Sequence, residues 1–215
     1  MSGNKVAELY GIRTEGAAGL HWQDVVSREQ CPFLGRKCVK SRKSRPEITI
    51  GTCVVQFGKK QENVIICPRR FLERKQVFLD CIHLLALHEP GNEIHVVPEV
   101  GIPGGNVDYF LVSAQRQKAV DFVGIELQAL DTSGTVWPAR QRFLQDHGVR
   151  VRRQDALSEK TFGMNKKMTA KTTLVQVHHK VETFEGLSKH FVLVLQDVLL
   201  AYMRKSFRFG LELSP

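Results

Sequence analysis

Three strand-like segments joined by short links constrain the fold of this 215-residue chain most strongly. Apolar and β-branched residues dominate 94–100, 107–113 and 120–130, and the links are a Gly- and Pro-containing hexapeptide at 101–106 and a polar stretch at 114–118. Links of this length join neighbouring strands in antiparallel order. The segments therefore predict an antiparallel sheet of three strands.

Helical patterns on either side of these segments extend the sheet into a layered fold. Helices are expected from Pro68 to about Glu89, around 138–146, over 165–184 and over 197–205. The apolar run 191–195 is typical of a further, buried strand. This order of elements predicts a mixed α/β fold, in which a central mixed sheet is flanked by helices.

Charge and hydropathy narrow the choice of partner and compartment. Lys and Arg total 31 against 22 acids, a net charge of +9, which favours an acidic polymer because neutralising phosphates releases condensed counterions. No apolar stretch reaches the roughly 18 to 20 residues that a membrane span needs. The first residues lack the apolar region of a secretory signal, so we expect a cytoplasmic protein with no membrane partner.

The N-terminal third contains short local patterns and an unusual composition. Residues 1–30 suggest two short helices, at Val6–Tyr10 and Trp22–Arg28, and are interpreted as an arm. A hairpin is expected over 52–66. The stretch 31–67 has too few large apolar residues for a core of its own, so it needs either a metal or docking against the remainder of the chain.

Residues 31–67 also hold the densest basic run and four of the five cysteines. The six basic residues are Arg36, Lys37, Lys40, Arg42, Lys43 and Arg45. We expect them to contact DNA phosphates, although a solvated surface is the common alternative. The cysteines are Cys31, Cys38, Cys53 and Cys67, separated by six, fourteen and thirteen residues. These spacings differ from paired Cys-x-x-Cys zinc motifs, so scattered buried thiols are the alternative to a metal site; Cys81 is interpreted as a core thiol.

Polar side chains lie on two of the three expected strands. Asp108 is at the start of one strand, and Glu126 and Gln128 lie on the next, where residues two apart share a face. Neighbouring strands can therefore bring Asp108 and Glu126 together as a two-carboxylate clamp. Such a clamp suits Mg²⁺, which takes oxygen ligands and assists phosphodiester hydrolysis, and Gln128 would orient the attacking water. The alternative is a solvent-facing strand, but 122–130 is otherwise apolar.

These motifs, in this order, resemble the PD-(D/E)XK nuclease core of NotI-like restriction endonucleases. The central motifs are Val97-Pro98-Glu99-Val100, Gly104-Gly105-Asn106-Val107-Asp108-Tyr109 and Gly124-Ile125-Glu126-Leu127-Gln128. The similarity extends back through Cys31-Pro32-Phe33, Cys38, Gly51-Thr52-Cys53 and Ile66-Cys67-Pro68-Arg69-Arg70, and forward through 171–184 and 191–197. It covers most of the chain from residue 31 onward.

The resemblance implies roles for the motif residues. Asp108 and Glu126 would hold the catalytic Mg²⁺, Glu99 would be an additional acid, and Gln128 would stand where the family pattern usually has a Lys. The four cysteines would form a structural Cys₄ site, which holds iron in the NotI-like family, although four thiolates suit Fe and Zn equally well. The departure at Gln128 leaves the usual charged stabiliser unassigned.

Together these features predict a Cys₄-containing N-terminal arm and subdomain over 1–67 and a restriction-endonuclease-like core over 68–215. The expected function is that of a Mg²⁺-dependent type II restriction endonuclease, a homodimer that cuts both strands of double-stranded DNA at a specific GC-rich palindrome. A cognate DNA methyltransferase is the expected partner in the host. A structure-specific repair nuclease and a non-catalytic, metal-stapled DNA-binding module are the alternatives.

Overall fold

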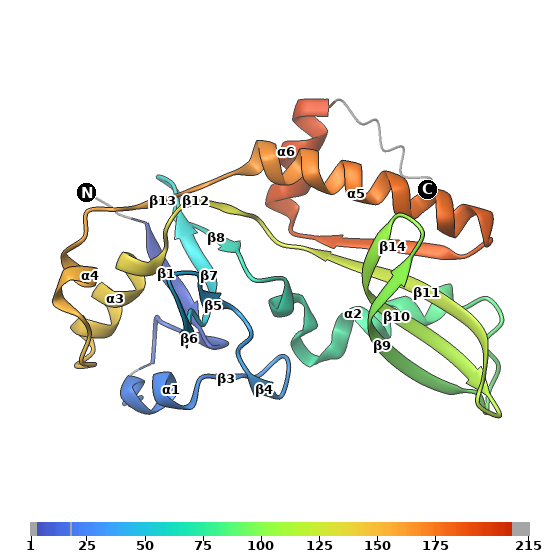
Figure 1. Cartoon of the computed structure of the whole chain (residues 1–215), viewed down its shortest axis with the longest axis horizontal. Helices are drawn as coiled ribbons and strands as arrows, with labels where there is room; N and C mark the ends of the chain where they lie inside the picture. Colours follow the sequence, from blue (N-terminus) through green and yellow to red (C-terminus); the bar gives the residue numbers. More distant parts are fainter. Residues whose placement is uncertain (1–3, 18, 208–215) are drawn as a thin grey trace. The chain divides into compact units, whose positions relative to one another are not determined.

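The structure is a computed structural model that describes residues 4–17 and 19–207. The chain divides into two compact units (Figure 1): unit 1 comprises Met1–Arg70 and Ala129–Lys166, and unit 2 comprises Phe71–Gln128 and Lys167–Pro215. The chain thus passes from unit 2 back to unit 1 and then returns. Sequence reasoning assigned 129–166 to the nuclease core, whereas the structure groups this segment with the N-terminal residues. The functional domains themselves stay a prediction.

Unit 1 is built on an antiparallel sheet of four strands in the order β2-β1-β7-β8. Its strands are β1 (Lys5–Leu9), β2 (Ile12–Arg13), β7 (Thr52–Phe57) and β8 (Glu62–Ile65). Three antiparallel pairs lie outside it: β3 (Gln30–Cys31) with β4 (Arg36–Lys37), β5 (Ser41–Arg42) with β6 (Arg45–Thr49), and β12 (Thr132–Gly134) with β13 (Phe162–Met164). The helices of this unit are α1 (Trp22–Arg28), α3 (Trp137–Asp146) and α4 (Arg153–Leu157).

The core of unit 1 explains why residues far apart in sequence belong to it. Leu9, Trp22, Leu144 and Val149 form one buried cluster, so the segment carrying α3 completes the core that the N-terminal residues begin. The predicted helix at Val6–Tyr10 is wrong: Val6–Leu9 lie in β1 and Tyr10 lies in the turn that follows, because pairing with β7 outweighs a weak local preference. The helix at Trp22–Arg28 and the hairpin of β7 and β8 are confirmed.

Unit 2 contains the predicted mixed sheet. Its strands are β9 (Glu93–Ile102), β10 (Gly105–Gln115), β11 (Lys118–Gln128) and β14 (His190–Leu195), in the order β14-β11-β10-β9. β9, β10 and β11 are antiparallel, and β14 runs parallel to β11. The helices α5 (Lys166–Gly186) and α6 (Asp197–Phe207) flank β14 in the sequence. The mixed α/β fold is therefore confirmed, but β14 is an edge strand that is half-buried along 191–195 rather than buried.

The single helix predicted from Pro68 to Glu89 is instead three short pieces. They are η1 (Pro68–Lys75), α2 (Gln76–Cys81) and η2 (Ile82–Leu84). Glu73 and Arg74 depart from helical geometry, with φ of 53° at Arg74. Residues six apart lie on different faces of a straight helix, so this break lets Leu72 and Phe78 both be buried.

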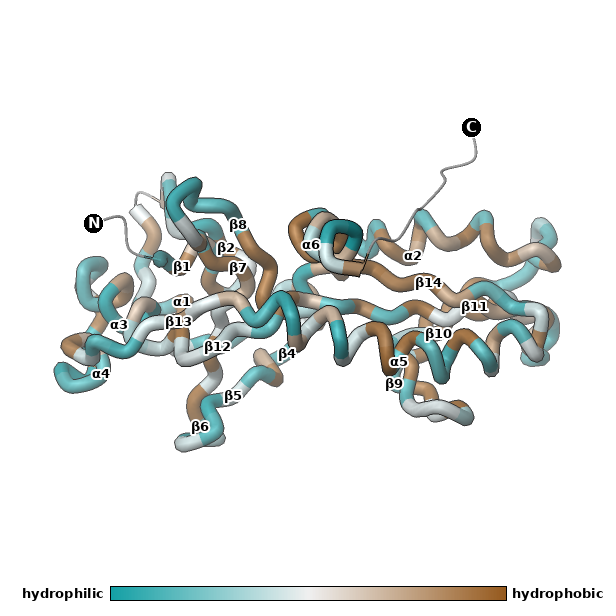
Figure 2. Tube along the Cα trace, turned by 90° about the horizontal axis from the view of Figure 1, so that it is seen from above, coloured by the Kyte–Doolittle hydropathy of each residue, from teal (hydrophilic) through white to brown (hydrophobic). Residues whose placement is uncertain are grey.

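Helix α5 covers one face of the unit 2 sheet. The rings of Phe110, Phe122, Phe184 and Phe191 pack together there, with centroids 5.1 to 6.1 Å apart. Phe78 of α2 packs on Tyr109, which points to the opposite face, and Figure 2 shows α2 and α5 on opposite sides of β10 and β11. Among the described helices, none is long and apolar enough to span a lipid bilayer.

Candidate functional site

Asp108 and Glu126 lie at the point where the ladder between β10 and β11 ends. The last paired residues are Tyr109 and Ile125, and Asp108 and Glu126 are the next residues on their strands. Side-chain contacts take over there: the Asp108 main-chain N–H donates to Glu126 Oε2 at 3.4 Å, and the Leu127 N–H donates to Asp108 Oδ2 at 2.9 Å. Each carboxylate is thus oriented by the backbone of the other strand.

Both carboxylates belong to the face of the sheet that α5 covers. Burial alternates along β11, with Ile125 and Leu127 buried and with Glu126 and Gln128 half-buried. The alternation confirms that Glu126 and Gln128 share a face. Parallel pairing with β14 continues to Gln128, opposite Leu195. The end of β11 therefore stays paired with β14 beyond the point where its pairing with β10 ends.

Glu99 occupies the same level of the sheet on the third strand. Val107 pairs with Val100, and Tyr109 pairs with Pro98, which places Glu99 beside Asp108. Glu99 is exposed and has a φ of 56°, a left-handed conformation that is uncommon for residues other than glycine. Three adjacent strands therefore each bring one acid to this level, although no group of three such residues in the described chain is arranged to hold a metal ion.

Sequence reasoning missed Lys180. Its Nζ donates to Glu126 Oε1 at 2.7 Å, and the residue is only 4% exposed. A signal was present, because Lys180 follows the buried Thr173 by seven residues and precedes the buried Phe184 by four. That spacing puts a lysine on the inward stripe of an amphipathic helix, where a charged residue is rare unless paired.

The contacts of α5 explain how Lys180 reaches Glu126. A Cβ at Gly124 would collide with the ring of Phe184, so the helix rests on β11 at a position that only glycine permits. Four residues of helix advance about 6 Å, and two residues of strand advance about 6.6 Å. Phe184 lies over Gly124, and α5 runs antiparallel to β11. Lys180, one turn earlier in the helix, therefore lies over Glu126.

The four N-terminal cysteines gather in one part of unit 1. Cys31, Cys53 and Cys67 are buried and Cys38 is half-buried, and Cys53 and Cys67 pack in one cluster with Val54. A side-chain hydrogen bond with Cys53 lowers the pKa of Cys67 to about 6 and raises that of Cys53. Burial raises the pKa of Cys38, and the nearby charges of Cys67 and Cys31 add to the increase.

These thiols do not form a metal-binding geometry in this structure. In the described residues, no three ligating side chains are placed to share an ion. Cys38 donates to the Lys40 carbonyl at 4.0 Å, and Cys53 donates to the Gly51 carbonyl at 3.5 Å. The four thiols therefore lie in one part of unit 1 and have the donor chemistry of a thiolate site, but not its arrangement.

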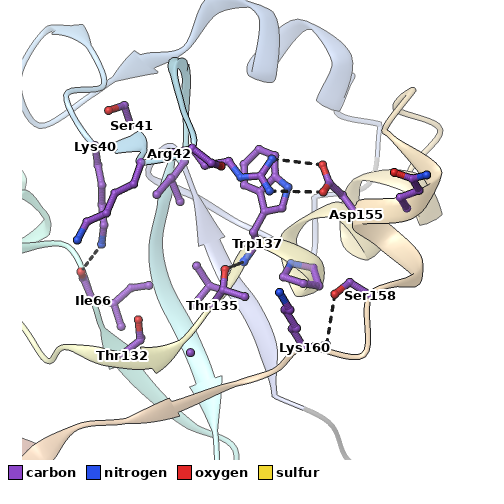
Figure 3. A pocket seen from close by; sticks show the side chains of 17 residues that line it. Lys40, Ser41, Arg42, Ile66, Thr132, Thr135, Trp137, Asp155, Ser158 and Lys160 are labelled. Atoms are coloured by element: carbon purple, nitrogen blue, oxygen red, sulfur yellow. Dashed lines mark hydrogen bonds and ion pairs between the residues drawn. The ribbon is translucent and has the colours of Figure 1, made fainter.

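Part of the basic run lines a cavity in unit 1 of about 720 Å³ (Figure 3). Its charged lining residues are Lys40, Arg42, Lys43, Asp155 and Lys160. Arg42 pairs with Asp155 at 3.4 and 3.5 Å and lies over the Trp137 ring at 4.6 Å, while the Lys40 Nζ donates to the Ile66 carbonyl at 2.8 Å. Cations outnumber acids in this lining, so its potential favours anions.

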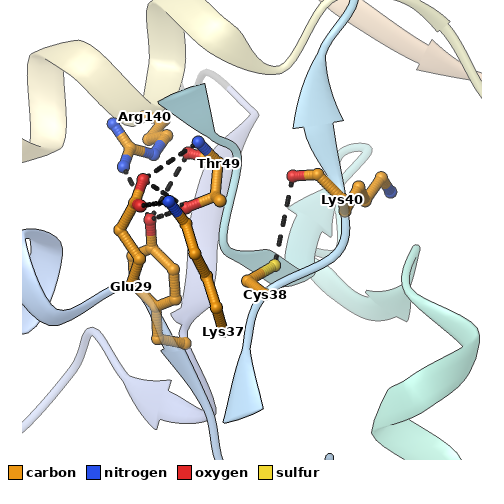
Figure 4. Close-up of polar contacts among 7 residues, drawn as sticks. Glu29, Lys37, Cys38, Lys40, Thr49 and Arg140 are labelled. Carbon is orange, nitrogen blue, oxygen red and sulfur yellow. Dashed lines mark hydrogen bonds and ion pairs between the residues drawn. The ribbon is translucent and has the colours of Figure 1, made fainter. Parts of the chain in front are cut away.

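A polar network centred on Glu29 holds Lys37 of the basic run (Figure 4). Glu29 accepts hydrogen bonds from the main-chain N–H and hydroxyl of Thr49 at 3.1 and 2.8 Å, and it pairs with Lys37 at 2.6 Å. Burial alone would raise the pKa of Glu29, but these contacts outweigh it and lower the pKa. The buried Arg140 donates to the Ile50 carbonyl at 2.7 Å. Arg36, Lys43 and Arg45 form no side-chain ion pair with any described residue.

Comparison with known proteins identifies the family. The family model described as restriction endonuclease NotI matches residues 23–209, which is most of the chain. No curated protein and no solved structure matches. The resemblance that the motifs predicted is thus confirmed: the chain belongs to the NotI restriction endonuclease family.

Proposed function

We propose that this protein is a Mg²⁺-dependent type II restriction endonuclease that cuts both strands of double-stranded DNA at a specific sequence. The observation that carries the proposal is the pair of carboxylates at the end of the β10–β11 ladder. Asp108 and Glu126 come from adjacent strands, each is oriented by a main-chain N–H of the other strand, and both are partly exposed. Membership of a restriction endonuclease family supplies DNA as the substrate.

The donor set at this position suits magnesium. Mg²⁺ is usually held by one or two carboxylates, with waters and substrate phosphate oxygens completing its coordination. Asp108 and Glu126 would hold the ion, and Glu99 would be an additional acid beside Asp108. When bound, Mg²⁺ supplies Lewis-acid stabilisation of the negative charge that develops on the scissile phosphate. Gln128, on the same face as Glu126, would orient the attacking water. We therefore assign this sheet to a PD-(D/E)XK core.

The basic run of unit 1 would bind the DNA backbone. Arg36, Lys43 and Arg45 are not committed to ion pairs within the described chain, and Lys40, Arg42 and Lys43 line the cavity in Figure 3. Each phosphate that the protein neutralises releases condensed counterions. For each such contact, the logarithm of the affinity should fall by about 0.9 for every tenfold rise in salt concentration. Two such chains related by a two-fold axis would cut both strands of a palindrome, so we propose a homodimer and a cognate methyltransferase in the host.

The structural Fe or Zn site at Cys31, Cys38, Cys53 and Cys67 is also a proposal. Its support is the presence of four thiols in one part of unit 1, where the hydrogen bond with Cys53 lowers the pKa of Cys67 to about 6, in a segment with few large apolar residues. Elemental analysis of protein purified without chelators should find about one Fe or Zn per chain, and Cys38→Ser should reduce that content. Metal-free protein with normal DNA affinity would show that these are ordinary thiols.

Digestion of a sequenced plasmid with and without Mg²⁺ tests the proposed function. A sequence-specific enzyme gives discrete fragments in Mg²⁺ only, and mapping their ends identifies the recognition site. Smears or nicks would indicate a structure-specific nuclease, and intact DNA would indicate a binding module. Asp108→Ala and Glu126→Ala should abolish cutting while leaving DNA binding intact, with circular dichroism as the control for folding. Cutting by either folded variant would remove that residue from the site.

A further inference from the structure

The proposed active site lacks a positive charge among the residues that the sequence assigned to it. Asp108 and Glu126 are acids, and the Gln128 amide is neutral, yet the phosphate that they act on is negative. We propose that Lys180 of α5 supplies the fixed positive charge of this active site, in place of the cation that Gln128 cannot provide. The inference rests on the nuclease function proposed above and adds a residue to it.

The contact between Lys180 and Glu126 is the first support. The Nζ lies 2.7 Å from Glu126 Oε1, and the lysine side chain is 5% exposed, whereas the glutamate side chain is 13% exposed. The acid is therefore the more accessible partner, and the lysine approaches it from the interior. A buried ion pair of this kind is a poor source of stability, because apolar residues of similar volume often stabilise a fold as well or better.

The packing around Lys180 holds it in place from two directions. Phe184, one turn later, is seated on β11 at Gly124. On the other side, the Thr183 hydroxyl donates to the Pro103 carbonyl at 2.7 Å, and a Cβ at Gly104 would lie 2.7 Å from the His179 carbonyl oxygen. The β9–β10 turn thus lies against the same turn of the helix that carries Lys180. Its ammonium group is positioned by backbone packing rather than by a flexible surface.

Two functions follow from this position. The positive charge holds Glu126 in one orientation beside Asp108, and from behind that carboxylate it offsets part of the negative charge that develops when the scissile phosphate is hydrolysed. Preorganised charges of this kind stabilise the transition state because they need no rearrangement when the reaction occurs. Lys180 forms and breaks no bond in this role.

Single-turnover cleavage of a duplex carrying the mapped site tests the proposal. Lys180→Met keeps most of the length of the buried chain and removes its charge. We expect the rate constant to fall by about 10²- to 10³-fold, as for loss of one preorganised group that stabilises the transition state, with DNA affinity nearly unchanged. Lys189→Met is the matched control, because Lys189 pairs with another acid of the same strand, Asp121, and it should cut at the wild-type rate.

Rescue distinguishes a charge at the active site from a structural contact. Gln128 lies two residues from Glu126 on the same face, so Gln128→Lys places an ammonium group on that face. In the Lys180→Met background, Gln128→Lys should recover at least about tenfold of the lost rate, and Lys180→Arg alone should retain more activity than Lys180→Met. If the folded double variant stays as slow as Lys180→Met, the charge is not what Lys180 contributes and the proposal is wrong.

Metal-dependent stability gives a readout that does not require cleavage. Lys180 and Mg²⁺ would share Glu126 and their positive charges repel, so Mg²⁺ should raise the Tm of Lys180→Met more than that of wild type or Lys189→Met. Equal shifts in the three proteins would contradict the proposed contact. If wild type cuts DNA and Lys180→Met cuts equally fast, only the role of Lys180 is lost. If wild type cuts no DNA in Mg²⁺, the nuclease function fails and this inference fails with it.

Discussion

The two halves of strand β11 each carry an acid paired with a lysine, but the two pairs are built differently. Asp121, near the start of the strand, pairs with Lys189 at 2.6 Å, and Glu126, near its end, pairs with Lys180 at 2.7 Å. In the first pair the acid side chain is 2% exposed and the lysine 21%. In the second the acid is 13% exposed and the lysine 5%. The order of burial is reversed.

Hydrogen bonding also differs between the two acids, because Glu126 accepts from Lys180 and, at the longer distance of 3.4 Å, from the Asp108 N–H, whereas Asp121 accepts three bonds. Asp121 accepts the Leu87 N–H at 2.9 Å and the Phe122 N–H at 2.8 Å in addition to Lys189, so both of its oxygens are committed. Burial alone would raise the pKa of Asp121, but these contacts outweigh burial and lower it. A buried carboxylate whose oxygens are all hydrogen-bonded, such as Asp121, connects segments of the fold. An accessible one backed by a buried lysine is suited to a ligand that arrives from outside.

The largest expected effect separates the two acids by activity. Glu126→Gln should lower the Mg²⁺-dependent cleavage rate by at least about 10³-fold, more than the 10- to 100-fold typical of groups that only orient a ligand. Asp121→Asn should cut within a few-fold of wild type but lower the free energy of unfolding by about 1–3 kcal/mol, because a buried pair loses its charge. Rate measurements and urea unfolding of both variants check this. Equal losses of activity would erase the distinction between the two pairs.

Gln128 should show the next largest effect. If it orients the attacking water, Gln128→Ala should slow cleavage by about 10²- to 10⁴-fold with little change in stability. A single-turnover rate within twofold of wild type would instead make Gln128 an ordinary residue of the sheet face.

Gly124 lies between the two acids on β11, where Phe184 of α5 covers it. Gly124→Ala would push the helix from the strand, because the new Cβ collides with the Phe184 ring. We expect a loss of about 1–3 kcal/mol in the free energy of unfolding and slower cleavage, since Lys180 lies one turn from Phe184. Gly186→Ala is the control, because its Cβ would meet open space. Full activity in Gly124→Ala would show that the helix position is not critical.

The smallest effect concerns pH. Because the folded-state pKa of Asp121 is lowered, the unfolded chain binds the proton more readily, and the stability from this group is complete above the ordinary Asp pKa of about 3.9. It is lost as the pH falls further, through the folded-state pKa. The unfolding free energy of wild type should therefore drop more steeply below about pH 4 than that of Asp121→Asn. Parallel curves would contradict the hydrogen-bonded environment of Asp121.

Much of unit 2 was predictable because its signals are local. Alternating apolar residues between short links determine β9, β10 and β11, and the i, i+2 relation of Glu126 and Gln128 follows from strand geometry. The run 191–195 was correctly interpreted as a strand, but burial depends on what lies beside it, and β14 is at the edge of the sheet.

The rest depended on contacts between distant parts of the chain. Val6–Leu9 form a strand only because β7 pairs with them. The break at Glu73 and Arg74 allows two residues to be buried that no local rule connects. Lys180 is 54 residues from Glu126. Its position on the inward stripe of α5 could be seen in the sequence, but the partner that makes the position meaningful could not.

The return of residues 129–166 to unit 1 has a consequence for the order in which the protein folds. During synthesis, β9, β10 and β11 emerge before the last segment of unit 1, and α5 and β14 emerge after it. Neither unit can complete its packing in the order in which its residues are synthesised. Glu126 cannot pair with Lys180 until the whole intervening segment has been made. Contacts of such long sequence separation slow folding. Glu126 of the proposed nuclease site therefore gains its lysine only when most of the chain has been synthesised.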